Sequence, residues 1–249
     1  MNPSHILGVH FDLVDYDAVL SAVARWRGAG ERRSVVLSNP HSVLMCRRDP
    51  AMGEATAGAS LVLPDGVGIV WAARLLGLPH QGRVTGPELM LRLCEAGRAW
   101  DCRHYFYGGA EGVAQALAAR MAELFPGLEV AGTWTPPFRP LMQEEDAEDV
   151  ARINAGRPDV VWIGLGAPKQ EKWMAVHLGR IEAAALIGVG AAFDYHTGRV
   201  RWAPDWVRRA GLEWAYRLAH QPGRLWRRNL DSPVFLGKVV WEKVGRRKI

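Results

Sequence analysis

The sequence predicts an α/β fold in which helices cover both faces of a mostly parallel sheet. Short segments of almost entirely apolar residues alternate with longer segments that carry apolar residues at helical spacing. Strands that are apolar on both sides are buried on both faces, which is typical of parallel sheets with helical crossovers. The chain has 249 residues, of which 49% are hydrophobic, enough for one large domain or one domain with an appendage.

The elements follow one another in a regular order up to Gly198. Strands are predicted within residues 34–39, 60–65, 104–109, 128–134, 159–166 and 184–190. Helices are predicted at residues 15–27, 41–48, 66–77, 88–100, 111–125, 144–155 and 168–178. After Gly198 only short helical stretches remain, broken by Ala-Pro and Gln-Pro-Gly. We therefore expect a core at residues 1–198 and a helical appendage at residues 199–249.

The expected appendage differs from the core in charge and aromatic content. From Arg199 onward it has 13 Lys or Arg against four Asp or Glu, a net charge of +9, and it holds five of the 11 tryptophans. The first 198 residues carry a net charge of −4. Basic, Trp-rich helices are typical of binding to an anionic membrane surface. A basic helical pair packed on the core is the alternative, and the acidic core argues against a nucleic-acid partner.

The cysteines and the apolar segments bear on the location of the protein. Cys46, Cys94 and Cys102 form no Cys-x-x-Cys pair, so neither a disulfide framework nor a zinc site is expected, which fits a reducing cytoplasm. The sequence shows no pattern of a signal peptide and no run of ~18 apolar residues. If the protein meets a membrane, we expect it to lie on the surface.

Several predicted strands end in Gly or Asp, at Asp65, Gly108, Gly166 and Gly190. The carboxyl ends of parallel strands gather at one edge of a sheet, where ligands bind to loops and helix N-termini. Asp65 stands between a strand and a helix, so it is either a general base or a cap of that helix. The sheet edge is therefore the first candidate site.

Two glycine-rich segments could approach phosphate groups. Arg83 lies between Gly82 and the pair Thr85-Gly86. An arginine in such a segment could bind a phosphate through two hydrogen bonds, although a surface arginine on a turn is the alternative. Gly108 and Gly109 join a strand to a helix, as in a nucleotide phosphate loop or a generic turn. The segment lacks the Lys-Ser/Thr of a P-loop, so ATP hydrolysis is not expected.

Two further segments carry polar residues at expected strand ends. Pro168 suits the first turn of a helix, which would place Lys169 and Gln170 near the cleft. The lysine could neutralise a diphosphate and the glutamine amide could contact a base or a sugar, although a solvated charged helix is the alternative. Asp194 follows the last predicted strand, where it could bind a sugar hydroxyl or hold a loop.

In this order, these segments resemble the WecG/TagA/CpsF glycosyltransferases, glycosyltransferase family 26. The resembling segments are VVLSNPHSV (35–43), LVLPDGVGIVWAARLLG (61–77), RVTGPEL (83–89), YFYGG (105–109), DVVWIGLGAPKQEKW (159–173), IGVGAAFDYHTG (187–198) and RWAPDWVRRAGLEWAYRLAHQPGRLWRRNL (201–230). The resemblance covers most of the chain. It implies a Rossmann-like core with a basic appendage that binds the inner face of the cell membrane.

The resemblance also implies a reaction and the residues that serve it. A sugar would move, with inversion, from a UDP-sugar to an undecaprenyl-diphosphate-linked sugar in cell-surface polysaccharide assembly. Asp65 matches the base, Asn39, Arg83 and Gln170 match pocket residues, and Arg217, Arg224 and Arg227 match arginines that meet the acceptor diphosphate. One position departs from the family: Leu37 stands where a threonine is usual, and the neighbouring Ser38 points to the opposite face of its strand.

No cofactor is expected. We expect no Asp-x-Asp motif of the type that holds a divalent metal ion in many other transferases. A metal-independent reaction is therefore expected, in which Arg83, Lys169, a helix N-terminus or the appendage arginines neutralise the departing diphosphate. The donor sugar stays open among N-acetylmannosamine, its uronic acid and glucose, and a homo-oligomer is possible. A non-catalytic nucleotide-sugar or lipid-binding module is the alternative function, whereas an epimerase would need a dinucleotide fingerprint that the first helix lacks.

Overall fold

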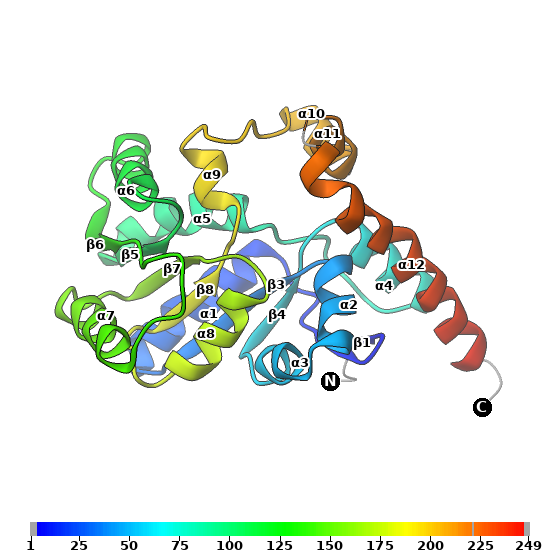
Figure 1. The fold of residues 1–249 in the computed structure, drawn as a ribbon, viewed down its shortest axis with the longest axis horizontal. Coiled ribbons are helices and arrows are strands. Elements are labelled where there is room, and N and C mark those ends of the chain that lie inside the picture. Colours follow the sequence, from blue (N-terminus) through cyan, green and yellow to red (C-terminus); the bar gives the residue numbers. More distant parts are fainter. Residues whose placement is uncertain (1–3, 221, 247–249) are drawn as a thin grey trace.

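The computed structural model describes residues 4–220 and 222–246, without the side chains of residues 222, 224–230 and 246. At the centre of this described part lies a six-stranded, all-parallel sheet of order β4-β3-β8-β7-β5-β6 (Figure 1). Its strands are β3 (Arg33–Ser38), β4 (Leu61–Pro64), β5 (Arg103–Gly108), β6 (Glu129–Trp134), β7 (Val160–Gly164) and β8 (Ala185–Gly188). The predicted α/β class, with a Rossmann-like core, is confirmed.

Helices cover both faces of this sheet (Figure 1). One face is covered by α1 (Tyr16–Ala29), α5 (Gly86–Gly97) and α6 (Val113–Leu124), and the other by α7 (Gln143–Ala155) and α8 (Lys169–His177). Successive strand residues point to opposite faces, so Leu37 packs in the first cluster and Val36 in the second. Helix ends follow local chemistry: Asp15 caps α1 by accepting from the Ala18 N–H, and Gly30 ends it in a left-handed conformation.

A third apolar cluster lies beyond β4 and joins the two ends of the chain. It is formed by the hairpin β1 (Ser4–Ile6) and β2 (Val9–Phe11), by α2 (Pro40–Arg48) and α4 (Val67–Leu76), and by α12 (Pro222–Arg246). Phe235 and Val239 of α12 are fully buried in this cluster. Figure 1 shows α12 running along α2 and α4. The last helix therefore shares a core with the N-terminal third of the chain.

Polar contacts add to this packing of α12. Asp231 is buried, and its carboxylate lies 2.5 Å from Nδ1 of His41 and 3.1 Å from Nη2 of Arg48, both on α2. Nearer the end of α12, Glu242 Oε2 accepts a hydrogen bond of 3.0 Å from the Leu7 N–H. The division of the chain after Gly198 stays a prediction, and in the structure α12 packs on the first part.

The remaining elements are short. They are α3 (Pro50–Ala57), the 3₁₀ helix Arg98–Trp100, α9 (Ala192–His196), α10 (Asp205–Arg209) and α11 (Glu213–His220). Sequence patterns did not predict the β1–β2 hairpin, α3 or α9, and they predicted short helices where α12 has 25 residues. Among the described residues, no helix combines the length and apolar character needed to cross a bilayer.

Candidate active site

The carboxyl ends of the strands lie side by side, as predicted. The register pairs Ser38 with Pro64, Ile163 with Gly188, and Gly108 with Gly164. The residues that follow these strands, among them Asp65 and Asn39, therefore belong to one edge of the sheet. Such an edge is where open α/β sheets bind ligands.

Asp65 lies directly after β4. Its N–H donates to the Ser38 carbonyl at 2.9 Å, which holds it against the end of β3. The helix that follows, α4, takes Gly66 as its N-cap, with φ of 94°. Asp65 therefore precedes the N-cap position of this helix, and the choice between base and cap stays a prediction. Its charge acts on the site, where it contributes to raising the pKa of Tyr16 and of Glu213.

Arg83 lies beside Asp65 but reaches toward the appendage. The next residue, Val84, donates its N–H to the Pro64 carbonyl at 2.9 Å, which fixes this loop to the end of β4. The Arg83 guanidinium donates through Nη2 to the Arg208 carbonyl, and its Nη1 lies 3.9 Å from Glu213 Oε2. The phosphate contact of Arg83 stays a prediction, and in the structure this side chain connects the core to α10 and α11.

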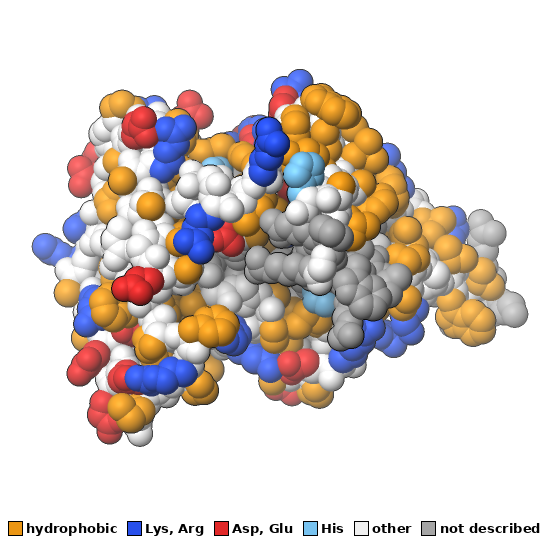
Figure 2. All heavy atoms as spheres, turned by 45° about the horizontal axis from the view of Figure 1, so that its top comes forward, with side chains coloured by type: hydrophobic (Ala, Val, Ile, Leu, Met, Phe, Trp, Pro, Cys, Tyr) orange, Lys and Arg blue, Asp and Glu red, His pale blue; other side chains and the backbone are white. Residues whose placement is uncertain are grey.

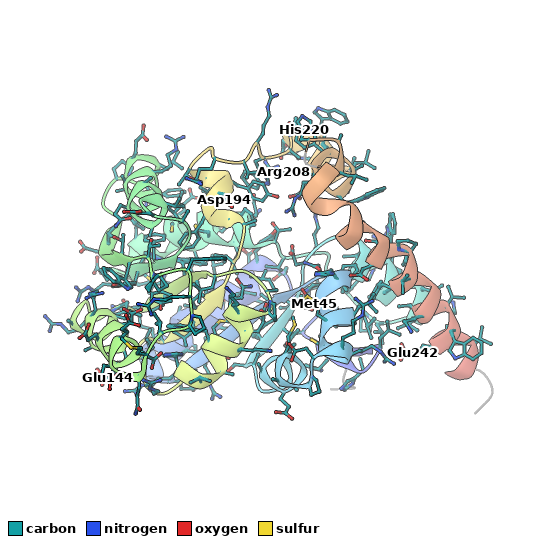
Figure 3. All side chains as sticks on the ribbon, in the orientation of Figure 1. Met45, Glu144, Asp194, Arg208, His220 and Glu242 are labelled. Carbon is teal, nitrogen blue, oxygen red and sulfur yellow. The ribbon has the colours of Figure 1, made fainter. Side chains whose placement is uncertain are left out.

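Two arginines of the appendage, Arg208 and Arg217, lie near the Arg83 side chain. The Arg208 guanidinium lies 3.8 Å from the ring centroid of Trp202 and 3.5 Å from Glu88 Oε2. Figure 3 draws Arg208 between Asp194 of α9 and His220 of α11. The Arg217 guanidinium lies 5.5 Å from the ring centroid of Tyr195. The appendage thus brings positive charge to the sheet edge, close to Asp65.

Glu213 is a site residue that sequence reasoning missed. It begins α11, and its side chain is 19% exposed. Burial raises the pKa of Glu213, the Asp65 carboxylate raises it further, and Arg83, Arg217 and Arg208 lower it. One sequence signal could have found it: Glu213 is the only acidic residue between Asp205 and Asp231, in a strongly basic segment.

Asn39 and the two glycines have structural partners at the same edge. Asn39 Oδ1 accepts from the Ser42 N–H at 3.1 Å and caps α2. Gly108 has φ of 112°, and a Cβ atom there would lie 2.9 Å from the Gly164 backbone, so the approach of β5 to β7 requires glycine. The Gly109 N–H donates to the Gly164 carbonyl at 3.1 Å. Strand packing thus explains these glycines without a phosphate, and their binding role stays a prediction.

Lys169 and Gln170, predicted to face the cleft together, point in different directions. Lys169 is exposed, and its Nζ lies 4.3 Å from the Phe138 ring centroid. Gln170 is buried against β8, where a Cβ at Gly188 would lie 3.1 Å from its Nε2. Its Nε2 donates to Glu171 Oε1 at 3.1 Å, and its buried Oε1 has no hydrogen-bond partner among the described residues.

The other predicted positions are local or lie outside the described side chains. Asp194 accepts through its carbonyl from the Val200 N–H at 3.1 Å and lies 3.6 Å from Arg199 Nε, which fits the loop-holding alternative. Arg217 lies on α11, as given above. Arg224 and Arg227 belong to α12, but their side chains lie outside the described residues.

Leu37 and Ser38 occupy opposite faces of β3, as expected. Leu37 is buried beneath the helices of the first face. Ser38 is completely buried, and its Oγ has no hydrogen-bond partner in the described part of the chain. Leu37 therefore makes an apolar contact, and Ser38 does not present a hydroxyl on that face.

We expected no Asp-x-Asp motif of the type that holds a divalent metal ion in many other transferases, yet the sequence contains one such triplet. It is Asp15-Tyr16-Asp17 at the start of α1. The Asp15 carboxylate caps the helix by accepting from the Ala18 N–H at 2.9 Å, and Asp17 is exposed. The Tyr16 hydroxyl lies 3.4 Å from Thr85 Oγ1 and accepts from the Thr85 N–H at 3.0 Å, so this segment supports the loop that carries Arg83.

The fold and this edge define an α/β protein with a Rossmann-like core and a site built from a carboxylate and arginines. The family model of the glycosyl transferase WecG/TagA/CpsF family matches residues 4–249. The chain therefore belongs to this family of glycosyltransferases.

Three similar curated proteins are each named N-acetylglucosaminyldiphosphoundecaprenol N-acetyl-beta-D-mannosaminyltransferase. The relative from Bacillus spizizenii is 32% identical over 206 residues, which cover 83% of this chain and 78% of the relative. One from Bacillus subtilis is 30% identical, with 84% and 79% covered. One from Staphylococcus aureus strain MW2 is 27% identical, with 96% and 92% covered.

Proposed function

We propose that this protein transfers a sugar from a UDP-sugar to an undecaprenyl-diphosphate-linked sugar, with Asp65 as the general base. The observation that carries the proposal is the position of Asp65, a carboxylate directly after β4 whose charge acts on Glu213 together with those of Arg83, Arg208 and Arg217. Family membership supplies the reaction class. The names of the relatives favour N-acetylmannosamine as the sugar and a diphosphoundecaprenol-linked N-acetylglucosamine as the acceptor.

The chemistry is a displacement at the anomeric carbon. The acceptor hydroxyl attacks this carbon from the face opposite UDP, a new glycosidic bond forms, and the bond to the UDP oxygen breaks, so the configuration inverts. Asp65 takes the proton of the hydroxyl, and UDP leaves with the bonding electrons. General-base assistance of this kind accelerates a reaction roughly 10²–10⁴-fold.

The negative charge on the leaving UDP must be stabilised. Arg83, Arg208 and Arg217 lie near the sheet edge, and guanidinium groups bind phosphate oxygens through two parallel hydrogen bonds. Positive groups already in place at the site of developing charge lower the barrier without reorganisation. We therefore propose that arginines, rather than a metal ion, serve the leaving group, and transfer in the presence of a chelator is expected to persist.

The appendage is proposed to bind the inner face of the membrane peripherally. Figure 2 shows hydrophobic side chains on the surface at the end of the molecule where α11 and α12 lie. Exposed apolar residues of α10 to α12 include Trp206, Trp214, Val240, Trp241 and Val244. Tryptophan rings favour the interface between lipid and water, and basic residues favour anionic headgroups by about 1 kcal/mol each.

The test is sugar transfer by the purified chain. UDP release is measured with a panel of UDP-sugars and a synthetic prenyl-diphosphate-linked N-acetylglucosamine, and the product is identified by mass spectrometry. Asp65→Asn is expected to lower kcat by about 10²-fold or more while UDP binding stays largely intact. Asp101→Asn, which neutralises an exposed aspartate, is the matched control.

Two outcomes of the transfer assay would contradict the proposal. Near-normal turnover of Asp65→Asn would remove Asp65 from the role of base. UDP binding by the wild type without transfer from any donor would instead favour the alternative, a non-catalytic nucleotide-sugar or lipid-binding module.

A further inference from the structure

Glu213 is a second carboxylate beside the proposed base, and it comes from the appendage. Its Oε2 lies 3.9 Å from Arg83 Nη1, and the Asp65 charge contributes to raising its pKa. The two acids lie far apart in the sequence, and the fold brings them to the same edge of the sheet. Glu213 is therefore part of the site geometry although no sequence motif marks it.

Helix stability alone does not explain the position of Glu213. An acidic residue in the first turn interacts favourably with the helix dipole, and it does so while exposed to water. Glu213 is instead mostly buried, near Asp65, and both burial and like charge disfavour its ionised form. Arg83, Arg217 and Arg208 offset this cost by favouring the carboxylate. A carboxylate held against such a cost points to a function for its charge.

Arg83 supplies the connection through which this charge can act. It belongs to the core, on a loop fixed to the end of β4 by the hydrogen bond from Val84 to Pro64. Its guanidinium contacts α10 through the Arg208 carbonyl and α11 through Glu213. None of the residues of α11, all of which are described, is fully buried. This helix packs against α12, and its contacts with the sheet edge run through Glu213 to Arg83 and through Arg217 to the Tyr195 ring.

We infer that Glu213 is a positioning residue that holds the Arg83 guanidinium and thereby fixes α10 and α11 over Asp65. In this arrangement, an acceptor bound by the appendage presents its hydroxyl to the base in the reactive geometry. Small displacements of reacting groups cost large factors in rate, about 10²-fold for 1 Å. The inference rests on the proposed function, because it assigns Glu213 to alignment of that reaction.

The inference predicts a pH signature. Protonation of Glu213 removes the charge that holds Arg83, so transfer falls as the pH drops through the raised pKa of this residue. Among the described residues, the charged groups that act on Glu213 are Asp65 after β4, Arg83 on a core loop, Arg208 on α10 and Arg217 on α11. In a Glu213→Gln variant this step is absent, and transfer is low at all pH values.

The experiment compares Glu213→Gln and Glu213→Asp with the wild type. Glu144→Gln is the matched control, since Glu144 is an exposed acid on α7, drawn far from Arg208 in Figure 3. Steady-state kinetics are measured against donor and acceptor separately, over a range of pH, and UDP affinity is measured by calorimetry. Glu213→Gln is expected to lower kcat/KM for the acceptor by about 10-fold or more and to leave UDP affinity within about twofold.

Glu213→Asp keeps the charge, so it is expected to retain part of the activity and the acid limb of the pH profile. It also serves if Glu213→Gln unfolds, a possibility checked by thermal melting. Unchanged kinetics and pH profile in Glu213→Gln, or a loss of UDP affinity equal to the loss of transfer, would overturn the inference. A wild type without transfer contradicts the proposed function, whereas an active wild type with an equally active Glu213→Gln contradicts only the role of Glu213.

Discussion

The two longer helices of the appendage, α11 and α12, are held to the core by different forces. Helix α12 buries Phe235 and Val239 in an apolar cluster shared with α2, α4 and the β1–β2 hairpin. Helix α11 has no fully buried residue and contacts the core through Glu213 and Arg217. Apolar burial does not depend on charge state or ligand, whereas ion pairs at a binding edge do. We therefore regard α12 as a permanent part of the fold and α11 as the part that responds to the contents of the site.

The largest expected loss of stability comes from removing an apolar side chain by which α12 packs in the core. Phe235→Ala removes a fully buried ring, and truncations of this kind cost about 3–5 kcal/mol of unfolding free energy. Denaturant unfolding measures the loss. Val234→Ala, at a neighbouring residue that is 45% exposed, is the control and is expected to change the free energy by less than about 0.5 kcal/mol. Equal effects of the two substitutions would contradict the burial of α12 in the core.

A smaller effect is expected from the polar part of the same anchor. Asp231→Asn removes the charge that pairs with His41 and Arg48, and loss of such a partly buried contact costs about 1–3 kcal/mol. Asp205→Asn on α10 breaks ion pairs of an exposed carboxylate and is expected to cost less than about 1 kcal/mol. If Asp205→Asn proved the more destabilising, the short helices rather than α12 would hold the appendage.

The stability of the sheet is expected to depend on pH through one buried histidine that belongs to neither α11 nor α12. Burial lowers the pKa of His104 from its ordinary 6.5 to about 3, and its Nδ1 accepts a hydrogen bond of 3.1 Å from Trp162 Nε1. As the pH falls below 6.5, the unfolded chain binds a proton at this residue and the folded chain does not. Stability is therefore lost between pH 6.5 and 3, by at most about 1.4 kcal/mol per pH unit.

The variant His104→Gln is expected to flatten this pH dependence, as measured by denaturant unfolding at several pH values. His220→Gln, at an exposed residue of α11, is the control and should leave the dependence as in the wild type. A wild-type slope that survives in His104→Gln would assign the acid sensitivity to other groups.

The smallest expected effect on stability concerns the outer face of α12. Trp241 is 82% exposed, so Trp241→Ala is expected to leave the unfolding free energy within about 0.5 kcal/mol. Binding to anionic vesicles should weaken severalfold in a sedimentation assay, because the ring can no longer enter the lipid interface. Unchanged sedimentation would count against docking through α12. A truncation after Gly198 is a less specific test because it also removes Phe235 and Val239 from the core.

Periodicity predicted the elements of the sheet and most of the helices that cover it. Most strands were recognisable because they are buried on both faces, and a segment such as Val160–Gly164 has no polar face to obscure the pattern. The β1–β2 hairpin was missed because its strands are three residues long, too short for alternation to show. Helix α12 was underestimated because Pro233 lies inside it and suggested a break.

Prediction of the site was less complete. Asp65 was identified because it stands at a strand end, a property of the local sequence. Arg83 was also identified, but its contacts with Arg208 and Glu213 could not be foreseen, since side-chain direction depends on which segment packs opposite. Gln170 was expected in the cleft and is buried, because Gly188 at the end of β8 and Gly190 beyond it leave room for its amide.

The sequence by itself determined the parallel α/β sheet, the edge at which Asp65 lies and the basic character of the appendage, because each follows from residues close together in the chain. Only the tertiary structure decided that α12 completes an apolar cluster with the N-terminal hairpin, and that Glu213 meets Arg83 beside Asp65. These contacts join distant segments, and their partners are selected by the burial of surface and charge when the chain folds, a selection that no local pattern records.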